Sequence, residues 1–128
     1  MKTAIVIDND RDIVEVFSDL LEMLEFDVIS KGYDGSDAIT MYEKFKPDVI
    51  FMDVHMDEMH GDQALKEIRT SDKDVKIVMV TGDMSKSMED TLEKYGASAI
   101  IHKPFDIKII DEIISELENA TSIVIQKA

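Results

Sequence analysis

The stretch Pro47–Asp53, with the sequence PDVIFMD, constrains the fold of this chain more than any other. Its apolar run Val49–Met52 is too short for a helix, and Pro47 ends any preceding helix because the residue before a proline avoids the helical region. A short unbroken apolar run is typical of a strand buried on both faces inside a parallel sheet. The run stops at the carboxylate of Asp53, and ligand sites in open α/β sheets lie just beyond the carboxyl ends of the strands. Asp53 is therefore the first candidate for chemistry.

Strand-like and helix-like patterns alternate along the whole chain. The predicted strands are residues 4–7, 26–30, 49–52, 76–81 and 99–102. The predicted helices cover about 13–24, 36–46 with Ser36 as N-cap, a stretch from Gly61, 85–95, and a stretch capped by Asp106. This alternation predicts an α/β fold with helices on both faces of a doubly wound, five-stranded parallel sheet in the order 2-1-3-4-5.

Two segments differ from the rest of this pattern. The helix over 85–95 has only Met88, Leu92 and Tyr95 on an apolar face, so we expect it to be the least anchored helix of the fold. Polar residues break the last helix after 118, and Ile123–Ile125 is apolar again. We therefore expect a domain over 1–118 and a C-terminal tail over 119–128 that is packed or frayed.

Composition excludes several classes of function. The chain has 14 Lys and Arg against 28 Asp and Glu, a formal charge of −14, so direct binding to nucleic acid or anionic membrane is not expected. It has no cysteine, which excludes disulfides, zinc–thiolate sites and a cysteine nucleophile. No apolar run approaches the roughly 20 residues that span a bilayer, and the first strand leaves no room for a signal peptide. A cytoplasmic location is the expectation.

Two separate predicted strands end on acidic residues. Asp8 and Asn9 follow the first strand, and Asp53 follows the third. In the predicted order these strands are neighbours about 4.8 Å apart, so the three side chains share one pocket. Carboxylates this close do not all ionise cheaply unless a cation intervenes. Oxygen ligands at an open sheet edge predict a Mg²⁺ site that keeps several waters.

Two further residues fit the same pocket. Thr81 ends the fourth strand, and Lys103 follows the fifth, which lies about 10 Å from the third and is within reach of a long side chain. A hydroxyl donor and an ammonium group are both suited to binding the oxygens of a phosphoryl group.

Taken together, these motifs resemble the receiver domain of two-component response regulators, over about residues 3–118. The residues that carry the resemblance are Asp8-Asn9, Asp53, Thr81 and Lys103-Pro104-Phe105. The resemblance implies a flavodoxin-like, three-layer α/β/α architecture of the CheY-like type. It also implies that Asp53 accepts a phosphoryl group from a phosphohistidine on a sensor histidine kinase or a histidine phosphotransfer protein.

The resemblance also implies roles for the other residues. Asp8, Asn9, Asp53 and the main-chain carbonyl of His55 would hold Mg²⁺. Thr81 and Lys103 would bind the phosphoryl oxygens, and the Lys103–Pro104 peptide would be cis. Such a protein is a phosphoacceptor switch that assists its own phosphorylation and dephosphorylation, rather than an enzyme acting on a separate substrate. Phosphorylation would draw Thr81 inward and shift the helix over 85–95.

No output domain follows the pattern, so the signal would pass through an unidentified downstream protein. Ile109 and Ile113 lie at the edge of the inward stripe of the last helix, and with Ile123–Ile125 they could form a partner surface or a homodimer through the 85–118 face.

This chain departs from the family pattern at three positions. Asn9 replaces a second aspartate, Ile100 replaces an aromatic switch residue, and Asp57 replaces a proline. The loss of one charge at Asn9 should lower the Mg²⁺ affinity, and an aliphatic Ile100 cannot switch as a ring does. His55 and His60 are expected to face solvent.

Two alternative functions stay open. Asp8-Asn9-Asp10 also matches the nucleophile motif of haloacid-dehalogenase-type phosphatases, although the acidic metal pair after the lysine is missing. A pseudo-receiver that binds a partner without phosphorylation would be compatible with Asn9.

Overall fold

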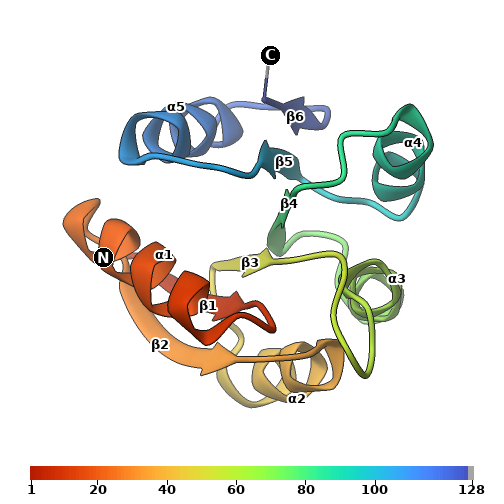
Figure 1. The fold of residues 1–128 in the computed structure, drawn as a ribbon, viewed down its shortest axis with the longest axis horizontal. Coiled ribbons are helices and arrows are strands. Elements are labelled where there is room, and N and C mark those ends of the chain that lie inside the picture. Colours follow the sequence, from red (N-terminus) through yellow and green to blue (C-terminus); the bar gives the residue numbers. More distant parts are fainter. Residues whose placement is uncertain (127–128) are drawn as a thin grey trace.

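The structure is a computed structural model, and it describes residues 1–126. In this part of the chain a parallel sheet of six strands lies between two layers of helices, with the strand order β2-β1-β3-β4-β5-β6 (Figure 1). The strands are β1 Thr3–Ile7, β2 Asp27–Gly32, β3 Val49–Met52, β4 Lys76–Thr81, β5 Ala99–His102 and β6 Val124–Ile125. The helices are α1 Arg11–Met23, α2 Gly35–Phe45, α3 Gly61–Ser71, α4 Lys86–Lys94 and α5 Ile107–Leu117. The predicted fold class and the order of the first five strands are confirmed.

The helices divide between the two faces of the sheet. Helices α1 and α5 cover one face, and α2, α3 and α4 cover the other (Figure 1). Strand β3 contributes to both hydrophobic layers, since Phe51 packs with Phe17 of α1 at a ring-centroid distance of 5.1 Å while Ile50 and Met52 pack on the opposite face. All four residues of β3 are buried, so the prediction of a strand covered on both faces is confirmed.

Helix α4 is attached by the fewest buried residues of the five helices in the described part of the chain. Its only buried residue is Leu92, whereas each of the other helices buries three or more. Ser85 caps its first turn by accepting a hydrogen bond from Met88 N at 3.2 Å. The thin apolar face predicted for residues 85–95 is confirmed.

Three details differ from the sequence predictions. Strand β2 begins and ends later than predicted, and α2 is capped by Asp34 rather than Ser36, because the Asp34 carboxylate accepts from Asp37 N at 2.9 Å. Ile113 is buried, with 5% of its surface exposed, instead of lying at the edge of the inward stripe. Ile110, Ile113 and Leu117 form the buried stripe of α5, so Ile113 is not available to a partner.

The tail adds a strand that the sequence pattern did not predict. Val124 N donates to Ser98 O at 3.0 Å and Gln126 N donates to Ile100 O at 3.0 Å, which continues the sheet in parallel beyond β5. Ile123 and Ile125 pack on one layer of the core and Val124 on the other. Residues 123–126 are therefore packed, and the rest of the predicted tail beyond 126 lies outside the described residues.

Within residues 1–126, no helix combines the length and the apolar character needed to cross a membrane.

Candidate functional site

The carboxyl ends of β1, β3, β4 and β5 bring four of the predicted site residues to one edge of the sheet. Asp8 follows β1, Asp53 follows β3, Thr81 ends β4 and Lys103 follows β5. Parallel pairing fixes this arrangement, since Asp53 N donates to Ile7 O at 2.9 Å and so continues the ladder past the end of β3. Three polar side chains are buried at this edge, since Asp8, Asp53 and Thr81 are exposed by only 3%, 6% and 1%. This group of side chains is called the notch below.

Lys103 is the cation of this notch. Its Nζ lies 2.7 Å from Asp8 Oδ2 and 3.4 Å from Asp53 Oδ1. Its backbone is held by β4, because Lys103 N donates to Thr81 O at 2.9 Å. The Lys103–Pro104 peptide bond is cis, as the resemblance implied. One ammonium group thus contacts both carboxylates, although β5 lies two positions from β3 and three from β1 in the sheet.

The electrostatics of Asp53 favour a further cation. Burial raises the pKa of Asp53, and the negative charge of Asp8 raises it further. The ammonium of Lys103 and the hydrogen bond from Val54 N to Asp53 Oδ1, at 2.8 Å, lower it only in part. Because the net shift of the Asp53 pKa is upward, a divalent cation beside this carboxylate would favour its ionised form. The donor set fits Mg²⁺.

The two residues after Asp8 have different surroundings. Asn9 is exposed. The carboxylate of Asp10 caps α1, accepting from Asp12 N at 3.0 Å and from Ile13 N at 3.3 Å, so it is not turned toward Asp53. In residues 1–126, no group of three or more His, Cys, Asp or Glu is placed to hold a metal ion. The notch itself has two carboxylates, those of Asp8 and Asp53, and the exposed Asn9 adds no negative charge to the segment that follows β1.

The hydroxyl of Thr81 is tied to the loop that follows β4. Its Oγ1 accepts a hydrogen bond from Asp83 N at 2.9 Å. Gly82 leaves this approach open, since a Cβ added there would meet nothing within 4 Å. One hydrogen bond therefore joins the Thr81 side chain to the loop that leads into α4.

A pair between two loops was missed in the sequence analysis. His55 Nε2 lies 3.1 Å from Asp83 Oδ2, which joins the loop after β3 to the loop after β4. Hydrogen bonds from Ser85, followed by the one from His55, lower the pKa of Asp83 to about 2. No sequence signal identifies this pair, because each residue looks like an ordinary polar loop residue until the two loops meet.

Both histidines of the site loop are exposed, as predicted. His60 has a local structural role, because its Nδ1 accepts from Met56 N at 3.2 Å while the side chain of Gln63 accepts from His60 N at 3.1 Å. Gln63 thus caps the start of α3, while the His60 ring is bonded to the loop at Met56.

The backbone of α3 lies directly against Asp53, and this contact was also missed. A Cβ added to Gly61 would lie 1.8 Å from the main-chain oxygen of Asp53. Only a glycine allows the start of α3 to come this close, so Gly61 fixes the main chain that carries Asp53.

Ile100 lies beside β6 and is 2% exposed, in the core layer formed with α2, α3 and α4. In the sheet it is paired with Ile125. An aliphatic side chain at this position fills the core and is covered at the strand edge by the tail.

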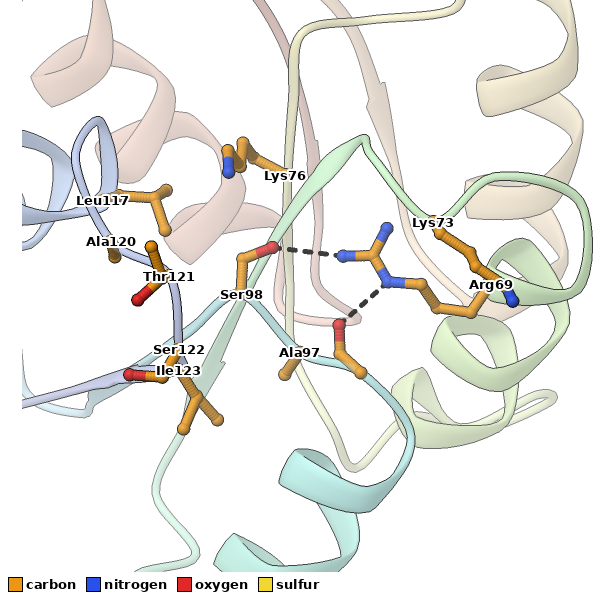
Figure 2. A pocket seen from close by; sticks show the side chains of 11 residues that line it. Arg69, Lys73, Lys76, Ala97, Ser98, Leu117, Ala120, Thr121, Ser122 and Ile123 are labelled. Atoms are coloured by element: carbon orange, nitrogen blue, oxygen red, sulfur yellow. Dashed lines mark hydrogen bonds between the residues drawn. The ribbon is translucent and has the colours of Figure 1, made fainter.

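A second hollow, of about 220 Å³, lies at the opposite edge of the sheet from Asp53, beside the starts of β4 and β5 (Figure 2). Arg69 lines it and is already engaged, donating from Nε to Gly96 O at 2.8 Å and from a terminal nitrogen to Ser98 Oγ at 3.1 Å. None of the residues that line this hollow belongs to the group around Asp53.

A doubly wound parallel sheet with two buried carboxylates, a threonine and a lysine at its carboxyl edge defines a class of signalling domain. The chain belongs to the response regulator receiver domain family, whose family model matches residues 4–115. This family consists of signalling switches that act in two-component systems.

Individual relatives support this assignment. The chain is 30% identical over 115 residues to the chemotaxis protein CheY of Bacillus subtilis strain 168, covering 90% of this chain and 96% of that protein. The structure of the chemotaxis response regulator CheY4 of Vibrio cholerae has a TM-score of 0.84 at 25% identity, covering 91% of this chain and 98% of that chain. A CheX–CheY–BeF₃–Mg complex from Borrelia burgdorferi also has a TM-score of 0.84, at 22% identity, covering 89% of this chain and 87% of that chain.

Proposed function

We propose that this protein is a response regulator receiver whose phosphoacceptor is Asp53. The observation that carries the proposal is the position of Lys103 Nζ, 2.7 Å from Asp8 and 3.4 Å from Asp53, in a notch where both carboxylates are buried. Two buried carboxylates share one ammonium, so the site still carries an excess negative charge, and a divalent cation bound there would make it suited to receiving an anionic phosphoryl group.

The chemistry follows from these positions. A carboxylate oxygen of Asp53 attacks the phosphorus of a phosphohistidine, the P–N bond breaks, and the imidazole leaves with its electron pair and takes up a proton. The product is an acyl phosphate on Asp53. Lys103 offsets the repulsion between the carboxylate and the incoming phosphoryl group, and Thr81 donates its hydroxyl to a phosphoryl oxygen.

Mg²⁺ is the proposed cofactor. Asp8 and Asp53 would hold it, with the main-chain carbonyl of His55 and, at lower affinity than a carboxylate, Asn9. When bound, the ion supplies charge neutralisation at the phosphoryl oxygens. The Borrelia complex contains both a beryllium fluoride group and Mg²⁺ on a protein of the same fold.

We propose a sensor histidine kinase or a histidine phosphotransfer protein as phosphodonor, in the cytoplasm. Phosphorylation would draw Thr81 inward, and because Asp83 N bonds to the Thr81 hydroxyl, the loop into α4 would follow. Helix α4 is held by a single buried residue, so it is the element most easily displaced. A downstream protein would read this change. A homodimer through the 85–118 face stays a prediction, now without Ile113.

The test is incubation with acetyl phosphate and Mg²⁺, followed by intact mass and peptide mapping. We expect one added phosphoryl group on Asp53, lost in Asp53→Asn and kept in Asp8→Asn at a lower rate. Labelling that depends on Asp8 as nucleophile would instead support a haloacid-dehalogenase-type phosphatase. Absence of any labelling and of any Mg²⁺ effect would support the pseudo-receiver.

A further inference from the structure

The C-terminal strand β6 holds β5 along its whole length. At one end, Val124 N bonds to the carbonyl of Ser98, beside the turn through Thr121 that Figure 2 shows. At the other end, Gln126 bonds twice. Its backbone N–H donates to Ile100 O at 3.0 Å, and its side-chain Oε1 accepts from His102 N at 2.6 Å. The side chain of Gln126 thus continues the pairing past the last residue of β6.

The bond from Gln126 reaches the residue next to the proposed site. His102 directly precedes Lys103, and Lys103 N donates to Thr81 O at 2.9 Å. The end of β5 is therefore held from two sides, by β4 through Lys103 and by the tail through Gln126. Both bonds fix the main chain from which the Lys103 side chain extends.

We propose that Gln126 is a positioning residue that holds Lys103 in its place beside Asp8, and that docking of β6 therefore opposes binding of a phosphoryl group at Asp53. This inference rests on the proposed function. In the structure, with the tail docked, Lys103 Nζ lies closer to Asp8 than to Asp53. A phosphoryl group would draw Lys103 and the Thr81 hydroxyl toward its oxygens.

The consequence is a coupling between the tail and the site. In the sheet order, β5 lies between β6 on one side and β4 and β3 on the other, so Gln126 and Asp53 are on opposite sides of β5. Lys103 N bonds to Thr81 O, so movement of both residues toward a phosphoryl group on Asp53 shifts the end of β5 away from Gln126. The bond from the Gln126 side chain is then lost, since β6 has only two residues in strand geometry to follow the shift. Coupling of two binding events is reciprocal, so removing the bond favours phosphoryl binding as much as phosphoryl binding weakens the bond.

The first measurement is the affinity for fluoroberyllate in the presence of Mg²⁺. We expect Gln126→Ala to bind it about two- to tenfold more tightly than the wild type, the range that one hydrogen bond supports. Asp48→Ala is the matched control, because the Asp48 carboxylate accepts from Thr3 N at 2.8 Å and so also clamps a strand, at the opposite end of the sheet. The control should lose stability and keep the wild-type affinity.

The second measurement is amide hydrogen exchange in the wild-type protein, which does not depend on any variant folding. The amides of His102 and Gln126 should exchange several-fold faster once fluoroberyllate and Mg²⁺ are bound. A wild type that binds fluoroberyllate with unchanged exchange at His102, or a Gln126→Ala variant with wild-type affinity, would overturn the coupling and leave the proposed function standing. A wild type that binds no fluoroberyllate would overturn both.

Discussion

Gly61 offers the sharpest test of the geometry around Asp53. A Cβ on Gly61 would lie 1.8 Å from the main-chain oxygen of Asp53 and 2.9 Å from its carbonyl carbon. The start of α3 has little room to retreat, because Gly61 N donates to Val54 O at 2.8 Å. The atoms in conflict are backbone atoms, which cannot rotate away as a flexible side chain does.

The size of the effect follows from these distances. The Asp53 carbonyl and the helix start must separate by 1.2 Å to bring the contact from 1.8 to 3.0 Å, below which real Cβ contacts essentially never occur. Overpacking costs roughly 1–3 kcal/mol, and a conflict with backbone belongs at the upper end. For a domain of this size, a loss of about 3 kcal/mol lowers the Tm by roughly 10 °C.

The assay is thermal unfolding followed by circular dichroism for the wild type, Gly61→Ala and Gly82→Ala. Gly82 is the control, because a Cβ there would meet nothing within 4 Å, and we expect its Tm to stay within about 2 °C of the wild type. Since Asp53 is displaced in Gly61→Ala, this variant should also be phosphorylated more slowly by acetyl phosphate. If Gly61→Ala and Gly82→Ala had the same Tm, the close approach of α3 to Asp53 would be refuted.

Three further predictions concern charge, pH and packing. Asp53→Asn should raise the Tm at pH 7, because burial and the charge of Asp8 raise the pKa of Asp53 and make its ionised form unfavourable in the folded state. That gain should shrink as the pH falls through the raised pKa, and a variant less stable than wild type at pH 7 would contradict it. The hydrogen bond from the Tyr42 hydroxyl to Asp72 raises the pKa of Tyr42 from 10.0 to about 12, so its stabilisation is complete below pH 10.0 and is lost as the pH rises to about 12. In urea titrations at pH 8 the free energy of unfolding of Tyr42→Phe should be about 1 kcal/mol below that of the wild type. Between pH 10.0 and about 12 it should fall less than that of the wild type, and an equal fall in both proteins would argue against this. Leu92→Ala should cost about 2–5 kcal/mol and remove hydrogen-exchange protection from α4, whereas a loss of protection spread evenly over all helices would show that α4 is not separately anchored.

The strand order and the positions around Asp53 were predictable because their patterns admit few alternatives. An apolar run as short as Val49–Met52 between a proline and an acid has one reasonable interpretation, and alternation with helices then fixes a parallel sheet. Once the order is set, the carboxyl ends of the strands must meet at one edge, which places Asp8, Thr81 and Lys103 near Asp53. Their chemical roles remain a proposal.

Other features depended on information that the pattern lacks. The sequence Asp34-Gly35-Ser36 contains two good cap residues, so either could begin α2. Isoleucines crowd α5, and more than one helical stripe fits them, which is why Ile113 was placed at the edge. Two residues are too few for β6 to show a strand period. The His55–Asp83 pair exists only because two loops meet in three dimensions.

The short β6 also affects how the protein behaves in concentrated solution. Without it, the outermost strand on that side would be β5, whose residues Ala99–Ile101 are all buried in the folded chain. An apolar edge with open backbone groups invites pairing with strands of other molecules and hence aggregation, whereas a very short edge strand offers little to pair with. The tail thus acts as a cap for solubility, and any condition that frees it for long would shorten the useful lifetime of a purified sample.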